Sequence, residues 1–194
     1  MSITYKEILS SVAFGLTFLA FFPYIRSVLR GTTKPHVFSW VIWGSTTLVV
    51  FAAQLADGGG VGAWPIGFSG AVTIYVAGLA YTKKSDVTIT RADWLFFLVA
   101  ATSLPCWYLA ANPLWAVAIL TAVDILGFGP TFRKAYCNPF DEQLTFFVLM
   151  AARNAIAAAA LEHYSLTTLM FPTVMAAVCV VFIATVLYRR RVAI

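Results

Sequence analysis

Two ionisable residues, Asp124 and Arg153, lie deep inside apolar stretches of the sequence. A charge at the centre of a bilayer costs about 2.5–3.5 kcal/mol on insertion scales, so such residues mark solute paths, proton relays or ion pairs. Asp124 lies ten residues before Lys134, and Arg153 lies ten residues after Gln143. At the helical rise, both lie about 15 Å from the loop that joins their two stretches. We therefore expect the two side chains to share one level of the membrane and to form an ion pair.

Four further residues are weaker candidates for the same solute or coupling site. Asn154 adjoins Arg153, although adjacent helical residues point about 100° apart and do not face one cavity equally. Gln54 and Tyr75 bring polar groups into other apolar stretches, where such groups often bond to neighbouring helices. Trp43 lies deep enough to stack on a planar solute, although packing is the commoner role of such a ring.

The elements that must position these residues are long apolar blocks. The chain of 194 residues is 61% hydrophobic and 11% charged, and its mean hydropathy is +0.85. A soluble domain cannot bury that much apolar surface. Each block is near the roughly 20 residues that cross about 30 Å of hydrocarbon. The sequence therefore predicts an all-α membrane protein, with residues 1–194 as a single integral membrane domain. Its seven transmembrane helices are expected at about 8–29, 37–56, 61–81, 93–111, 114–131, 144–161 and 166–188.

The net charge of +5 follows the predicted spans. Apart from Arg153, one side of the membrane carries eleven basic residues and the other carries Lys6 alone. Cytoplasmic loops are enriched in Lys and Arg, so the N-terminus is predicted outside and the C-terminus in the cytoplasm. The basic pI therefore reflects orientation in a membrane, and we expect no nucleic-acid partner. The eleven residues are Arg26, Arg30, Lys34, Lys83, Lys84, Arg91, Arg133, Lys134, Arg189, Arg190 and Arg191.

Four prolines indicate an internal duplication. Pro23 and Pro130 are 107 residues apart, and Pro65 and Pro172 have the same separation. A proline inside a helix removes a backbone hydrogen bond, so we expect these four positions to act as hinges. A fixed offset of this kind indicates a repeat. Two triplets of helices keep a parallel orientation only if one further span joins them, which predicts a 3+1+3 arrangement. Repeat one covers about 5–82, the linker helix about 92–111, and repeat two about 113–189.

The repeat bears on the role of the charged pair. Thr17 and, about, Thr47 take the places of Asp124 and Arg153 in repeat one, so the shared scaffold does not require the charges. Two interpretations remain open. The pair is either a lock between its two helices, or a site for a solute or a proton.

The layout resembles the PQ-loop superfamily, which includes the sugar-transporting SWEET proteins. Pro23 and Pro130 correspond to the prolines of that family's Pro-Gln pairs, while Tyr24 and Thr131 stand in place of the glutamines. The resemblance implies seven helices in a 3+1+3 order and transport of a small solute. The segments TKPHVFSWVIWG and AQLADGGGVGAW also resemble those of small bacterial membrane proteins, which implies an inner (plasma) membrane.

The expected function is therefore a transporter or facilitator for a small polar solute, with a polar site at mid-membrane. The alternative is a non-transporting receptor or accessory subunit that uses the same bundle to bind a ligand or a partner. The sequence contains no Ser-His-Asp order, HExxH or CxxC spacing, so we expect no enzyme, no metal and no cofactor. The expected partners are membrane lipid and one unidentified small solute. An oligomer is possible but not required, because one chain carries both repeats.

Overall fold

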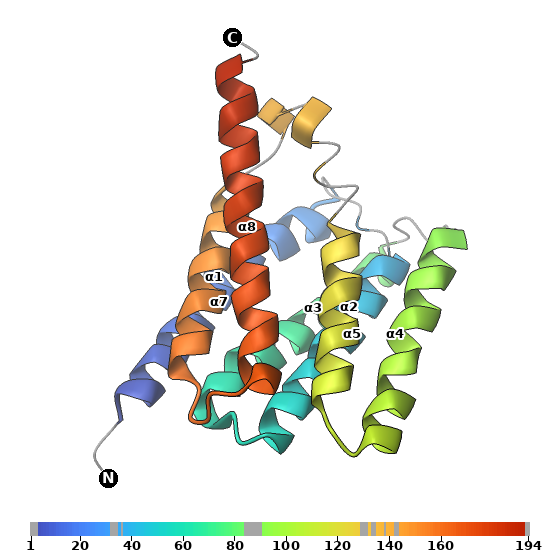
Figure 1. Ribbon diagram of the computed structural model, residues 1–194. Helices are drawn as coiled ribbons and strands as arrows, with labels where there is room; N and C mark the ends of the chain where they lie inside the picture. The colour runs from blue at the N-terminus through green and yellow to red at the C-terminus, as the bar shows by residue number, and fades with distance from the viewer. Residues whose placement is uncertain are drawn as a thin grey trace.

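The computed structural model describes residues 4–31, 35, 37–83, 91–128, 132, 135–137, 139–141 and 144–192. Within these residues all regular structure is helical, and each of the seven predicted apolar blocks contains one α-helix (Figure 1). The elements are α1 (Tyr5–Leu29), α2 (Val37–Ala56), η1 (Gly60–Ala63), α3 (Trp64–Thr82), α4 (Arg91–Ala110), α5 (Leu114–Gly127), η2 (Pro139–Asp141), α7 (Leu144–Ala160) and α8 (Leu166–Val192).

Three described helical segments are long and apolar enough to cross a membrane: Tyr5–Leu29, Gly60–Thr82 and Leu166–Val192. These helices indicate an integral membrane protein. Shorter apolar helical segments accompany them at Trp40–Ala56, Phe97–Ala110, Leu114–Gly127 and Leu144–Ala160.

Local signals set several helix ends. The hydroxyl of Thr4 accepts the backbone N–H of Glu7, and the carboxylate of Glu7 accepts that of Thr4, which together start α1 with a capping box. The turn after α2 places Gly58 and Gly60 at φ of +75° and +58°, a region that side chains with a Cβ rarely adopt. Arg189 and Arg190, in the last turn of α8, reach the segment between α5 and α7. There Arg189 donates to the carbonyl of Tyr136 at 3.0 Å.

Successive helices run in alternating directions, so α1 begins and α8 ends at opposite ends of the bundle (Figure 1). α3 packs on both α1 and α2, and α8 packs on both α5 and α7. The two groups meet where α1 packs on α7 and α2 packs on α5. α4 packs on α5 and α2 at one edge of the bundle (Figure 1). Among the described residues, Lys6 lies at the end where α1 begins, whereas Arg26, Arg30, Lys83, Arg91 and Arg189–Arg191 lie at the opposite end. We call these the Lys6 end and the basic end.

Glycines bring α2 and α3 into close contact. A Cβ at Gly67 would lie 2.8 Å from the ring of Phe51, and one at Gly44 would lie 2.6 Å from the side chain of Ile74. Such distances leave no room for a methyl group, so these backbones approach because both residues are glycine.

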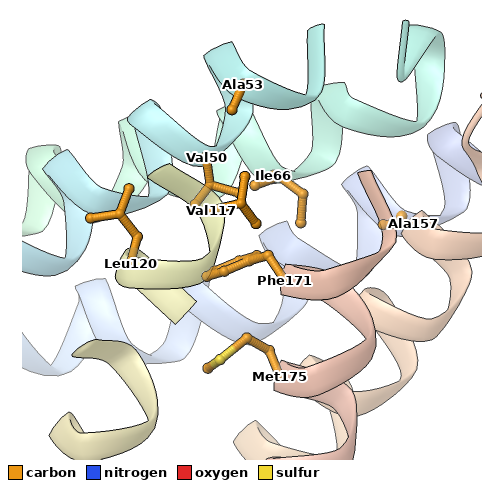
Figure 2. Packing of buried hydrophobic residues seen from close by; sticks show 9 residues of the cluster. Val50, Ala53, Ile66, Val117, Leu120, Ala157, Phe171 and Met175 are labelled. Atoms are coloured by element: carbon orange, nitrogen blue, oxygen red, sulfur yellow. The ribbon is translucent and has the colours of Figure 1, made fainter. Parts of the chain in front are cut away.

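A buried apolar cluster holds six helices together and lies between mid-bundle and the Lys6 end. Phe171 and Met175 of α8 point towards Val50 of α2 and Val117 of α5 (Figure 2). No described side chain of α4 is a buried member of the cluster. Its members are Ala13, Val50, Ala53, Ile66, Val117, Leu120, Ala157, Phe171 and Met175.

The predicted hinge prolines occupy different settings. Pro23 and Pro172 lie inside α1 and α8, which both continue past them. Pro65 lies in the first turn of α3, directly after η1, rather than deep inside a helix as expected. Pro130 lies outside the described residues. Pro105, inside α4, is a further helix proline that the repeat did not indicate.

Candidate functional site

A cavity of about 230 Å³ lies between six of the helices. α1, α2, α3, α5, α7 and α8 all contribute side chains, and no described side chain of α4 lines it. The lining residues are Phe21, Trp40, Trp43, Thr47, Ser69, Thr73, Asp124, Gly127, Phe128, Phe146, Phe147, Met150, Arg153, Asn154, Phe171 and Met175.

The lining divides into an aromatic half and a polar half. Trp40 and Phe146 lie near the starts of α2 and α7, at the basic end. Thr47 and Arg153 follow seven residues later in the same helices, about 10 Å further from that end. Aromatic rings therefore lie between the polar groups and the basic end. Phe21 links the two sides, because its ring meets Trp40 at 6.4 Å and Phe146 at 6.0 Å between centroids.

Arg153 is 2% exposed and brings more hydrogen-bond donors than the protein uses. Its Nη2 donates to the hydroxyl of Ser69 in α3 at 3.1 Å. Its Nε and Nη1 have no hydrogen-bond partner among the described residues. Buried polar groups are nearly always paired, and an unpaired charged group carries the largest penalty. An unsatisfied guanidinium that lines a cavity is therefore typical of a binding site.

Asp124 faces the same cavity from α5 and is 6% exposed. Its Oδ1 accepts a 3.4 Å hydrogen bond from the hydroxyl of Thr46, which also donates to the carbonyl of Trp43 at 2.9 Å. One hydroxyl proton serves both acceptors, so the longer bond to the carboxylate is the weaker one.

The predicted ion pair is absent. The structure describes both Asp124 and Arg153, and their carboxylate and guanidinium do not bond to each other. The depth argument placed them at one level, and both do line one cavity. It could not establish contact, because the rotation of each helix and the space between the helices come from packing. Asn154 also lines the cavity, with a buried Oδ1 that has no described partner, and Trp43 forms part of the aromatic half.

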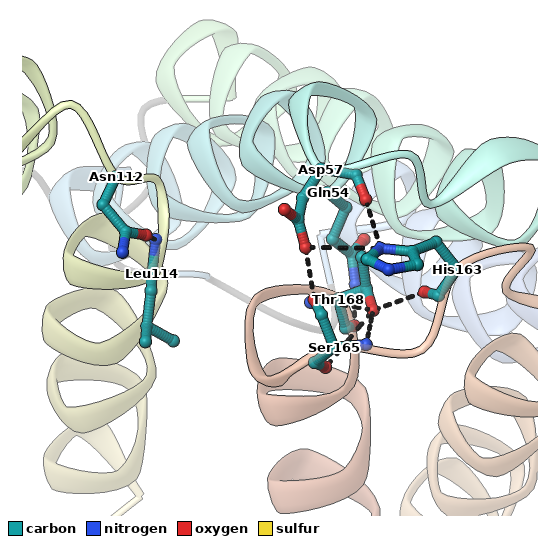
Figure 3. Close-up of polar contacts among 7 residues, drawn as sticks. All are labelled: Gln54, Asp57, Asn112, Leu114, His163, Ser165 and Thr168. Carbon is teal, nitrogen blue, oxygen red and sulfur yellow. Dashed lines mark hydrogen bonds and ion pairs between the residues drawn. The ribbon is translucent and has the colours of Figure 1, made fainter.

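Gln54 lies away from the cavity and bonds to backbone instead (Figure 3). It is fully buried, and its Nε2 donates to the carbonyl of Thr168 in α8 at 2.7 Å. That carbonyl is four residues before Pro172, which has no N–H to offer it. Prolines are tolerated in membrane helices where a neighbour satisfies the freed carbonyl. Gln54 therefore supports the proline of α8 rather than a solute.

The matching carbonyl in the first half of the chain is bonded in the same way. Val61 is four residues before Pro65, and its carbonyl accepts the hydroxyl of Ser10 at 2.7 Å. Sequence reasoning missed both bonds. The signal that could have found them is a polar residue at the depth of a proline's i−4 carbonyl.

Tyr75 is also placed outside the cavity. It is 54% exposed and lies in an outward crevice between α1 and α3, beside Phe18 and Phe68. It does not join the other candidates in the cavity, because the face of α3 that carries Ser69 and Thr73 points inward and Tyr75 points to the outside.

A polar network closes the Lys6 end (Figure 3). Asp57, in the turn after α2, accepts the hydroxyl proton of Ser165, and its carbonyl accepts Nδ1–H of His163 at 2.9 Å. The backbone N–H of Glu162 donates to the carbonyl of Gly59 at 3.1 Å. These residues join the α2–α3 and α7–α8 turns, and we call them the turn network.

Lys6 adds a third element to the turn network. Its ammonium donates to the carbonyls of Leu161 and Glu162, at 2.5 and 3.3 Å. A cation suits this position because the carbonyls at a helix C-terminus carry partial negative charge. The turn network and the apolar cluster thus form a thick closure on this side of the cavity. Towards the basic end the described residues provide the aromatic half and a second buried apolar cluster, made of Ala135, Phe182 and Val186.

No protein-family model matches this chain, and the searches of curated proteins and of solved structures found no match either.

Proposed function

We propose that this protein is a transporter or facilitator for a small polar solute, which binds in the cavity that contains Asp124 and Arg153. In this proposal all seven α-helices cross a bacterial inner membrane as a 3+1+3 bundle. The observation that carries it is a central cavity with two buried charges, neither of which is compensated by the other. Residues of this kind inside a membrane usually mark a solute or ion path.

The packing of the helices supports the repeat. Exchanging α1, α2 and α3 for α5, α7 and α8 turns each contact of the first group into one of the second. The same exchange turns the α1–α7 contact into the α5–α2 contact. The six exchanged helices line the cavity, while α4 stays at the edge, as a linker would. Binding between two repeats at mid-membrane is the usual plan of such transporters.

Alternating access would use the closures at the two ends of the cavity. Among the described residues, the Lys6 end is closed by the apolar cluster and the turn network, and the basic end by aromatic rings and the buried cluster of Ala135, Phe182 and Val186. Rocking of the two repeats would open one closure while the other holds. The excess of basic residues assigns the basic end to the cytoplasm.

Orientation is tested by the accessibility of a tag at each terminus in intact cells and after permeabilisation. We expect the N-terminal tag to be accessible from outside and the C-terminal tag only after permeabilisation. A cytoplasmic N-terminus, or both tags on one side, would overturn the seven-span topology.

Function is tested by untargeted metabolite uptake into proteoliposomes, with empty vesicles as the baseline. A matched pair of variants makes the test specific. A Cβ at Gly127 would stand 3.1 Å from Nε1 of Trp43 at the cavity wall, whereas one at Gly78 in α3 would meet no atom within 4 Å. Gly127→Val should therefore abolish uptake, and Gly78→Val should retain it. Equal uptake by both variants, or none above empty vesicles for the wild type, would contradict the proposal.

A receptor or accessory subunit is the second candidate, and the closures at both ends of the cavity favour it. It predicts that a solute binds to the purified protein and never crosses the membrane. Solute binding without uptake in oriented proteoliposomes distinguishes the two functions.

A further inference from the structure

The chemistry of the cavity narrows the class of solute, if the cavity is a binding site as proposed above. Arg153 and Asn154 line one wall, and Nε and Nη1 of Arg153 and Oδ1 of Asn154 have no described hydrogen-bond partner. On another wall Asp124 holds a carboxylate with one weak hydrogen bond. The cavity therefore offers donors for an anion and an acceptor for a cation at separate places.

We infer that the cavity binds a zwitterion that carries a planar apolar group. Its carboxylate would accept from the free guanidinium N–H groups of Arg153, and its ammonium would donate to Asp124. Guanidinium groups form charge-assisted hydrogen bonds to carboxylates, and Arg153 has two nitrogen donors that no described residue uses. The planar group would lie in the aromatic half, between Trp40, Trp43 and Phe146.

Other classes of solute leave a charge unpaired. A neutral sugar neutralises neither Arg153 nor Asp124. An anion would satisfy Arg153 and be repelled by Asp124, and a cation would do the reverse. Buried charges need a partner of opposite sign, so only a solute with both charges completes the site.

The size of the cavity sets an upper limit. At roughly 30 Å³ per water, 230 Å³ corresponds to about eight waters, so we expect a solute with a single ring. The distance from Asp124 to Arg153 decides how far apart the ammonium and the carboxylate of the solute must lie. Two test compounds cover a short and a long separation of these charges. L-phenylalanine has both charges on one carbon, and 4-(aminomethyl)benzoate has them across a ring.

Binding is measured with purified wild-type protein in detergent, by isothermal titration. We expect at least one of the two zwitterions to bind, and its analogues without the carboxylate or without the ammonium to bind at least about tenfold more weakly, because each loses a charge-assisted hydrogen bond. For L-phenylalanine these analogues are 2-phenylethylamine and 3-phenylpropionate. L-alanine, which lacks the ring, should also bind more weakly.

Two variants test which side chain of the cavity binds the carboxylate of the zwitterion and which binds its ammonium. Arg153→Gln should remove the advantage of the carboxylate, so that the zwitterion and its amine analogue bind alike. Asp124→Asn should remove the advantage of the ammonium in the same way. If a variant does not fold, the analogue series on the wild-type protein still decides the matter.

The inference is overturned if neither zwitterion binds, or if the analogues bind as tightly as the parent. Failure of the inference and failure of the proposed function give different results. Zwitterion binding without uptake refutes transport and leaves the inference standing. Uptake of a neutral solute, with no zwitterion binding, refutes the inference and leaves transport standing.

Discussion

The bond between Gln54 and Thr168 predicts a specific energetic coupling between Gln54 and Pro172. Thr168 is fully buried, and its carbonyl has lost its intrahelical partner to Pro172. Gln54→Leu removes the donor and leaves that carbonyl bare, at a cost of about 1–3 kcal/mol. Pro172→Ala restores a backbone N–H four residues on, so the carbonyl remains bonded when Gln54 is replaced.

The coupling energy between Gln54 and Pro172 is obtained from a double-mutant cycle of Gln54→Leu and Pro172→Ala. Replacing Gln54 also removes its Oε1, which is buried without a described partner, and this relief offsets part of the loss. The offset is present with and without Pro172, so it cancels in the coupling energy. With Pro172 present, Gln54→Leu leaves the Thr168 carbonyl without a hydrogen bond, whereas after Pro172→Ala that carbonyl keeps the bond from the backbone N–H. The first loss costs more free energy of unfolding, so we expect a coupling energy of about 1–2 kcal/mol.

The assay is the free energy of unfolding in mixed micelles, by titration with denaturing detergent, for the wild type, both single variants and the double variant. Pro23→Ala is the control, because Pro23 lies inside α1 and no bond joins Gln54 to its i−4 residue, Leu19. Gln54→Leu with Pro23→Ala should therefore be additive. A coupling near zero with Pro172, or an equal coupling with Pro23, would refute the assignment of Gln54 as the partner of the freed carbonyl.

Three further predictions use the same unfolding measurement. Gly67→Ala should destabilise by about 1–3 kcal/mol because its methyl group overlaps a ring of α2, while Gly78→Ala, with open space around it, should be neutral or stabilising; equal effects would contradict the tight α2–α3 contact. Ser69→Ala should cost about 1.5–3 kcal/mol, because it removes the hydrogen bond to buried, charged Arg153, and no loss would mean that this bond contributes nothing. Lys6→Met should cost about 0.3–1 kcal/mol at low salt and less at high salt, since the ammonium sits at a helix C-terminus, and a cost that does not change with salt would refute the electrostatic reason.

Part of the site could be predicted from the sequence, and the reason is depth. A helix advances by a constant rise, so counting residues places Asp124 and Arg153 at one level, and both do line one cavity. Contact is a different matter. It depends on the rotation of each helix about its axis, which neighbouring side chains set. For that reason the ion pair was wrongly predicted, and Tyr75 lies on the outer face of α3 rather than in the cavity.

The roles of polar residues in the spans also depend on partners that are distant in the chain. Gln54 and Thr168 are 114 residues apart, and Ser69 and Arg153 are 84 apart. Spacing along one helix carries no information about such pairs. A proline inside a helix does indicate where such a partner is needed, because the carbonyl four residues before it is freed and must find some donor.

The sequence by itself determined the all-helical class, the positions of the apolar blocks, and the segregation of the basic residues. These properties follow from local composition and from the length of helix that a bilayer requires. The tertiary structure alone decided which side chains share the cavity, which donor each freed carbonyl receives, and that Asp124 and Arg153 stand apart. These properties depend on how the described helices pack. Close contacts at Gly44 and Gly67 set the fit of α2 on α3, and no local pattern encodes that fit.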